Sequence, residues 1–559
     1  MLNRREWSNF VGTLSRKPWR IPSHALEIVG LATRRAANRW HLRRAKDVHQ
    51  GLRQRPSWLP QTRLTASVGN ELLRWPAYTT VFLENAPEAI PTLPAEDAEA
   101  YLQTQRWPEC VIGAIGGGAP AARALAAAVA WMQSPKPTFD PAWEPYSASE
   151  RVANISVLLA TNPALRDTIE PQLLRNFLFA SAQWIDEHLE YYGEERSNNH
   201  FLNNARALVI AGSVLNAPEV LGRGLAIFQR FTPRLFAANG FLRERSSHYQ
   251  LVVAGWLFDA LHFARAAGAE IGEIEALERP VANACAALCA AIPDMDVHIG
   301  DISPDLPPMF SLLRLRRLYP WVFDGAEAVP PGDWRVLVRG QDALATCVPP
   351  GWPLPYTTHG HADLCSFIWR HAGRTVLADP GRASYRDAEQ TDACAHNSVL
   401  LEGMAPLAES VLSAGLWFPQ CYAQAHIELK DTVQGFTIEH DGFGRLRESC
   451  RHRRHISVSE GQLDVSDSLS GSGSAQVTLL WHFAPEFRLK TPNSLMTEDS
   501  LLDIECVSEH GTPSHISWRN YTFSAAYGEE KQASKLSVVF DVQLPCMLHS
   551  RFRVSTCAA

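Results

Sequence analysis

The stretch HGHADLCSFIWRHAGRTVLADPGRASYRDAEQTDACAHN, residues 359–397, places polar side chains at intervals within an otherwise apolar segment. His359 and His361 are two residues apart, so on an extended backbone both imidazoles leave the same face. CSFIWR, HAGR and TVLAD predict a strand, a turn and a returning strand, which bring Asp379 back toward the two histidines. His396 is placed to close the set.

Two imidazoles and a carboxylate are ligands that zinc accepts, at roughly 2.0–2.2 Å. Histidines beside a carboxylate are also common as ordinary hydrogen-bonded residues. The spacing alone therefore leaves both a metal site and a polar network open.

Five segments, in order along the chain, resemble the signatures of the heparinase II/III-like polysaccharide lyases. They are NNHFLNNARALVIAG, LRERSSHY, HGHADLCSFIW, LADPG and AHNSV. The resemblance implies an incomplete (α/α) toroid joined to an antiparallel β-sandwich, with the active cleft between them. It also implies β-elimination on an acidic polysaccharide that contains uronic acid.

The resemblance assigns catalysis to four residues, and it leaves open which of His200, Tyr249 and His359 takes the C5 proton. Asn199 would neutralise the uronate carboxylate, because a hydrogen α to an ionised carboxylate is scarcely acidic, and His200 would lie beside it. Tyr249 and His359 would flank the cleaved linkage with His200. Asn198, Glu244 and Arg245 are the expected substrate-binding residues.

The same resemblance places one structural zinc ion on His361, Asp379 and His396, beneath the cleft. Some relatives use calcium or no metal, so the ion is an expectation. One departure is visible, because the family's arginine shortly before the His-Asn pair is missing from DAEQTDACAHN. Arg386 lies earlier, so recognition of the acidic sugar is expected to differ.

Two other classes of function remain open. A glycoside hydrolase would need two carboxylates about 5–10 Å apart, one with a raised pKa, and Glu190, Glu244 and Asp301 are available. A non-catalytic glycan-binding protein of polysaccharide biosynthesis would keep the fold without turnover.

The length of the chain and the change in its sequence pattern predict two large domains. The 559 residues exceed one ordinary core. Residues 1–330 have helical periodicity, with Tyr249 at the top of a buried stripe, and residues 331–559 have short alternating stretches typical of an antiparallel sandwich. The first 65 residues are rich in Arg and Lys and resemble a solvated helical face or a surface for an acidic partner.

Composition limits partners and location. A net charge of −7 gives no reason to expect a nucleic-acid partner. The N-terminus lacks the apolar run of a secretory signal, so a cytoplasmic location is expected, with a periplasmic one left open. The most apolar window, residues 119–132, is too short to span a bilayer. Eleven scattered cysteines fit reduced thiols, and a homodimer is left open.

Overall fold

The computed structural model describes most of the chain. The described residues are 9–11, 55–64, 72–78, 93, 98–134, 137, 140–194, 197–291, 298–305, 312–324, 332–349, 351–352, 359–386, 389–408, 422, 424–509 and 511–556. Most of the basic N-terminal segment lies outside these residues. None of the helices in the described part of the chain is long and apolar enough to cross a membrane.

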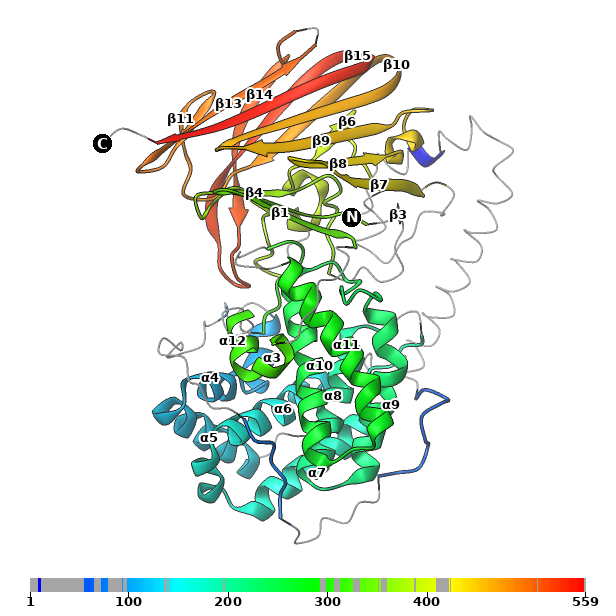
Figure 1. Cartoon of the computed structure of the whole chain (residues 1–559), viewed down its shortest axis with the longest axis vertical. Coiled ribbons are helices and arrows are strands. Elements are labelled where there is room, and N and C mark those ends of the chain that lie inside the picture. Colours follow the sequence, from blue (N-terminus) through cyan, green and yellow to red (C-terminus); the bar gives the residue numbers. More distant parts are fainter. Residues whose placement is uncertain are drawn as a thin grey trace.

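The first half of the molecule is helical and forms the lower body in Figure 1. Proline at the first turn of several helices, where its missing N–H costs no bond, helps to fix where they begin. The helices are α3 (Ala98–Gln105), α4 (Pro108–Gly116), α5 (Gly118–Gln133), α6 (Pro145–Thr161), α7 (Pro171–Glu187), α8 (Asn199–Val214), α9 (Pro218–Leu235), α10 (Ser247–Ala267), α11 (Ile271–Ala291), α12 (Leu312–Leu318) and α13 (Pro320–Phe323).

Helix α8 is the centre of the helical half. It packs against α6, α7, α9 and α10, and all of its residues except His200 are buried. A helix buried on every side must pair its polar residues internally. Arg206 does so, because its guanidinium contacts the Glu150 carboxylate at 3.0 Å and the Asp259 carboxylate at 2.5 Å. This rigid core fixes the position of the N-terminus of α8.

The second half is built of antiparallel strands and forms the upper body in Figure 1. A four-stranded sheet has the order β1-β2-β4-β5, and an eleven-stranded sheet runs β11-β12-β13-β15-β10-β9-β8-β7-β3, with β14 on β15 and β6 on β10. The strands are β1 (Trp334–Arg339), β2 (Asp342–Cys347), β3 (Gly351–Trp352), β4 (Ile368–His371), β5 (Arg374–Leu377), β6 (Val399–Leu401), β7 (Ala425–Asp431), β8 (Gly435–His440), β9 (His452–Ser459), β10 (Gln462–His482), β11 (Arg488–Thr491), β12 (Ser494–Met496), β13 (Ser500–Ser508), β14 (His515–Phe523) and β15 (Lys531–Thr556).

The predicted fold class is confirmed, since a helical half precedes an antiparallel sheet half. The last described helix ends at Phe323 and the first strand begins at Trp334, which is where the texture of the sequence changes. The predicted hairpin also forms, because β4 and β5 pair through the turn at Ala372 and Gly373. His359 and His361 precede β4 in an irregular segment rather than a strand.

The cluster RHRRH, residues 451–455, differs from the charged face that its composition suggests. His452 and Arg454 are fully buried, whereas Arg451 and Arg453 are exposed. Alternate residues of a strand face opposite sides, so one side of β9 joins the core.

Candidate active site

The N-terminus of α8 supplies the helical side of the site. Asn198 is the N-cap, and its side-chain oxygen accepts the backbone N–H of His200 at 3.2 Å. The Asn199 side chain is fully buried and donates from Nδ2 to Glu244 Oε2 at 2.8 Å. Its Oδ1 is shielded from solvent and accepts no hydrogen bond from the described residues. Asn199 is thus held by one contact and retains unused polar capacity.

His200 is the solvent-accessible member of this group, with its side chain 35% exposed. Its Nδ1 lies 3.0 Å from Glu190 Oε1, and its ring lies against Tyr146, with centroids 4.5 Å apart. Burial favours the neutral imidazole, but the Glu190 carboxylate outweighs it and raises the pKa of His200. The protonated form of His200 is therefore favoured, and an anion at this helix N-terminus would meet both that charge and the positive end of the helix dipole.

Tyr249 and His359 meet face to face across the two halves of the molecule. Their rings stack with centroids 3.6 Å apart and planes 9° from parallel. The Tyr249 hydroxyl shares a hydrogen bond with the Tyr385 hydroxyl. Burial raises the pKa of Tyr249, and the nearby carboxylates of Asp301 and Asp305 raise it further. Tyr249 therefore stays protonated and can donate its proton.

Asp301 holds His359 and His361 with one carboxylate. Its Oδ2 lies 3.0 Å from His359 Nδ1, and its Oδ1 lies 2.8 Å from His361 Nε2. Burial opposes ionisation, but hydrogen bonds from the two histidines lower the pKa of Asp301 far below its usual range. Arg382 Nη1 also contacts both carboxylate oxygens, at 2.8 and 2.9 Å. An ionised Asp301 only accepts, so each imidazole presents an N–H to it.

The two imidazoles therefore keep their lone pairs on the opposite nitrogens. These are His359 Nε2 and His361 Nδ1, and both are shielded from solvent without a hydrogen-bond partner among the described residues. His359 Nε2 lies 4.0 Å from Glu244 Oε2, the oxygen that also accepts from Asn199. The structure thus brings Asn199, Glu244 and His359 together across the junction.

A glycine makes this arrangement feasible. Gly300 has a φ of +78°, and a Cβ there would lie 2.7 Å from Arg245 O and 2.8 Å from His359 O. The close approach lets the Asp301 N–H donate to His359 O at 2.9 Å. The backbone and the carboxylate of Asp301 therefore both position His359.

The predicted metal ligands His361, Asp379 and His396 converge, with ligand atoms within 4.8 Å of one another and all three side chains buried. His396 Nδ1 lies 3.0 Å from Asp379 Oδ2. Burial favours neutral His396, but the Asp379 carboxylate raises its pKa. His396 Nε2, like His361 Nδ1, has no hydrogen-bond partner in the described part of the chain. Two unused imidazole nitrogens beside a carboxylate are a donor set that fits zinc.

The structure also places the remaining residues that the sequence singled out. Arg245 is buried, and its Nη2 contacts Asp363 Oδ1 at 3.0 Å and Cys347 O at 2.9 Å, so it joins the two halves of the molecule. Arg386 is exposed. Glu190, Glu244 and Asp301, the carboxylates that a hydrolase would use, each contact a histidine or asparagine of the site.

Three contributors to the site were not predicted from sequence. Arg382 holds Asp301, Tyr385 holds the Tyr249 hydroxyl, and Tyr146 packs on His200 while donating to Asp305 Oδ2 at 2.7 Å. Arg382 and Tyr385 lie within RASY, directly after the quoted LADPG segment. That proximity was the only sequence signal for them.

Comparison with known proteins agrees with the sequence-based family prediction. Residues 325–551 match the family model described as heparinase II/III-like, C-terminal. No curated protein matches the chain by sequence. Among solved structures, a heparinase III is 14% identical with a TM-score of 0.58, covering 83% of this chain and 79% of that one. A second heparinase III is 16% identical with a TM-score of 0.52, covering 83% and 80%. The heparan sulfate lyase of Pedobacter heparinus is 15% identical with a TM-score of 0.50, covering 83% and 78%. At these identities the structural likeness concerns the fold.

Proposed function

On the premise that residues 325–551 form a heparinase II/III-like C-terminal domain, we propose that the chain is a polysaccharide lyase that cleaves a uronic-acid-containing glycan by β-elimination. The observation that carries the proposal is the stacked pair of Tyr249 and His359, one a protonated phenol and the other an imidazole with an unused lone pair. An acid and a base side by side at a domain junction match the two proton transfers of an elimination.

The roles follow from the protonation state of each group. His359 Nε2 takes the C5 proton, because Asp301 holds the ring with that nitrogen free. Tyr249 donates its proton to the departing sugar oxygen, because its raised pKa keeps the phenol protonated. Both residues belong to the stacked pair, so the base and the acid are held next to each other.

The uronate carboxylate is neutralised at the N-terminus of α8. His200 supplies positive charge and the Asn199 amide supplies a second N–H. Charge-assisted hydrogen bonds of this kind stabilise the enolate-like charge that develops as the C5 proton leaves. Glu190 keeps His200 charged, and Glu244 orients Asn199.

Substrate entry requires a local opening. His359 Nε2 is shielded from solvent, with Glu244 Oε2 4.0 Å away. A sugar ring reaches this nitrogen only when Glu244 turns aside or the two halves of the molecule separate there.

A structural zinc ion on His361, Asp379 and His396 is part of the proposal. His361 Nδ1 and His396 Nε2 are available as ligands, with Asp379 as the third. When bound, the ion would fix the segment that carries His359. Asp301 would transmit this effect, because it contacts both His359 and His361.

Ultraviolet absorbance tests the elimination. Purified protein is mixed with a panel of uronate-containing polysaccharides, and absorbance is followed in the band of the conjugated unsaturated uronate. Wild type should give rising absorbance on at least one polymer, and Tyr249→Phe should lose it. The exposed Tyr101, outside the site, gives the matched control Tyr101→Phe, which should retain it.

The outcomes separate the classes of function. Reducing ends without the absorbance band would replace elimination by hydrolysis. Tight binding of a polymer without cleavage would favour a glycan-binding protein.

A further inference from the structure

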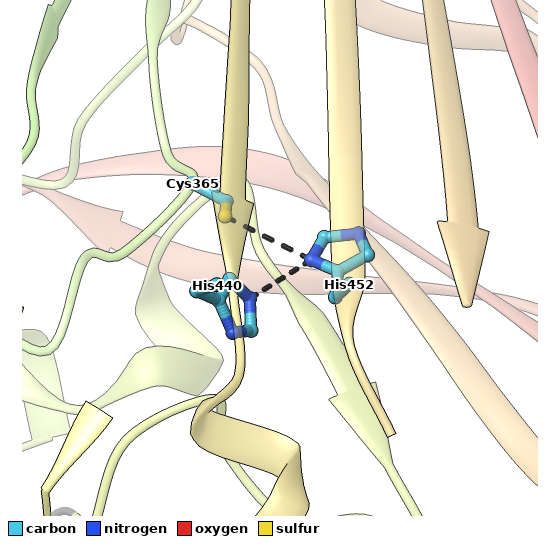
Figure 2. A group of neighbouring side chains, drawn as sticks. All are labelled: Cys365, His440 and His452. Atoms are coloured by element: carbon cyan, nitrogen blue, oxygen red, sulfur yellow. Dashed lines mark hydrogen bonds between the residues drawn. The ribbon is translucent and has the colours of Figure 1, made fainter. Parts of the chain in front are cut away.

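A second group of metal-ligand side chains lies inside the sheet half, and the proposed lyase chemistry uses none of them. Cys365, His440 and His452 are fully or almost fully buried, and their ligand atoms lie within 4.8 Å of one another (Figure 2). Cys365 lies in the segment before β4. His440 ends β8 and His452 begins β9, where the two residues form a cross-strand pair.

The protonation of His452 is set by Asp467 on the neighbouring strand β10. His452 Nε2 lies 2.7 Å from Asp467 Oδ1. Burial opposes the Asp467 charge, but Arg454 and His452 lower the pKa of that carboxyl to about 2. Arg454 contacts both oxygens, at 2.7 and 3.0 Å. Nε2 therefore carries the proton, and Nδ1 presents its lone pair to the centre of the cluster.

Two donors compete for that single lone pair. His440 Nδ1 accepts the Gly442 amide at 3.2 Å, so its Nε2 is the protonated nitrogen and donates to His452 Nδ1 at 2.9 Å. The Cys365 thiol also faces His452 Nδ1, at 3.8 Å. The thiol contact is long because one acceptor serves both groups. Replacing the two protons by one cation would use a donor atom from each of the three residues.

We infer that Cys365, His440 and His452 form a metal site for a soft or borderline ion, Zn²⁺ or Cu⁺. Thiolate and imidazole are the donors that these ions select, at roughly 2.3 Å for zinc–sulfur and 2.0–2.1 Å for zinc–nitrogen. The cross-strand pair fixes the two imidazoles, and Asp467 behind His452 supplies the carboxylate–histidine support typical of bound metals. The site is independent of the lyase proposal.

Binding has a defined proton balance. The Cys365 thiol loses its proton to solvent as the metal–sulfur bond forms, because a coordinating thiol is deprotonated. Burial raises the pKa of the metal-free thiol to about 12, so this proton is present before binding. The His440 proton moves from Nε2 to Nδ1 and displaces the Gly442 amide contact. That lost contact is the structural cost of binding, and it falls on the short turn after β8.

Cobalt spectroscopy on the full chain tests the inference. The protein is stripped with a chelator and titrated with Co²⁺ as a stand-in for Zn²⁺. A thiolate ligand gives an intense sulfur-to-cobalt absorption in the near ultraviolet. The junction cluster of His361, Asp379 and His396 contains no sulfur and can give only weak visible bands. We expect the sulfur band to saturate at one ion per chain.

Variants assign the band. Cys365→Ser should abolish it, whereas Cys450→Ser, which changes another buried thiol of the same sheet half, should retain it. His396→Ala should retain the sulfur band and lose only the visible absorption that the junction cluster contributes. Displacement of Co²⁺ by Zn²⁺ or by Cu⁺ under anaerobic conditions distinguishes the two ions. Absence of the sulfur band in wild type, which requires no variant to fold, would overturn the proposal, as would a band that survives Cys365→Ser.

Discussion

The molecule contains two buried groups of histidines. They differ in whether their imidazole nitrogens have hydrogen-bond partners. The junction group consists of His359 and the proposed metal ligands His361, Asp379 and His396. It leaves three imidazole nitrogens without a hydrogen-bond partner among the described residues. In the interior group, formed by Cys365, His440 and His452, each imidazole nitrogen has a contact within hydrogen-bonding range.

This difference predicts that substitutions in the two groups have different effects. A buried polar atom without a partner costs about 1–3 kcal/mol, so three of them in one place are retained for what they bind. The interior group is already hydrogen-bonded without an ion, so its side chains help to hold the core as well as forming the proposed metal site. We therefore expect changes in the junction group to reduce activity, and changes in the interior group to reduce stability.

The largest expected effect is at His359. His359→Ala removes the proposed base, and kcat should fall by about 10²–10⁴-fold, the usual contribution of a positioned general base. The midpoint of thermal unfolding should change little, because the ring is held at the junction rather than in a core. Absorbance kinetics and calorimetry measure the two quantities.

The exposed His515 gives the matched control, and His515→Ala should retain wild-type kcat. Full activity in His359→Ala would remove the junction group from the chemistry.

The opposite behaviour is expected of the interior group. Asp467→Asn leaves the buried Arg454 without its counter-charge, which typically costs about 3–5 kcal/mol of unfolding free energy. Denaturant unfolding measures the loss. Asp499→Asn breaks an exposed ion pair with Arg374 and should lower the unfolding free energy far less. Equal losses in the two variants would show that the interior group is not part of a stable core.

An intermediate effect is expected at Asp301, which contacts both the proposed base His359 and the proposed metal ligand His361. Asp301→Asn can no longer accept from both histidines as a carboxylate, and should reduce kcat/KM and zinc affinity by about 10–100-fold each. Steady-state kinetics measures kcat/KM, and metal analysis after dialysis measures the retention of zinc. A variant that loses activity but holds zinc like wild type would contradict the link through Asp301.

The smallest effect concerns pH. The Glu190 carboxylate raises the pKa of His200, so the charged form, and with it carboxylate binding, is present at low pH and is lost as pH rises through that pKa. Glu190→Gln should move this basic limb of the kcat/KM profile to lower pH by about one unit. The stability that the contact between Glu190 and His200 contributes is likewise present at low pH and is lost as pH rises through the pKa of His200. An unmoved limb would mean that His200 does not carry the charge.

Local patterns predicted most of the fold. The helical stripe below Tyr249 and the turn at HAGR are set by neighbours in sequence, so α10 and the β4–β5 hairpin were predictable. The N-cap of α8 is Asn198, the first residue of the quoted segment NNHFLNNARALVIAG. The roles of Asp301 and Arg382 were not predictable, because they depend on contacts between segments about eighty residues apart.

One strand of the interior group carries a sequence signal for its burial. In β9, His452 of this group and the nearby Arg454 alternate in phase with Ile456 and Val458, and all four residues are buried. The apolar pair indicates that this face of the strand is internal. The many charged residues of RHRRH obscure this alternation of buried and more exposed positions.

The masses of the cleavage products test the central claim most directly. A defined uronate-containing oligosaccharide is digested to completion by wild type, and the two fragments are weighed by mass spectrometry. Elimination at the junction of Tyr249 and His359 predicts fragments whose masses sum to that of the substrate, with the new non-reducing end unsaturated. Fragments that together exceed the substrate by one water would show hydrolysis and contradict the account.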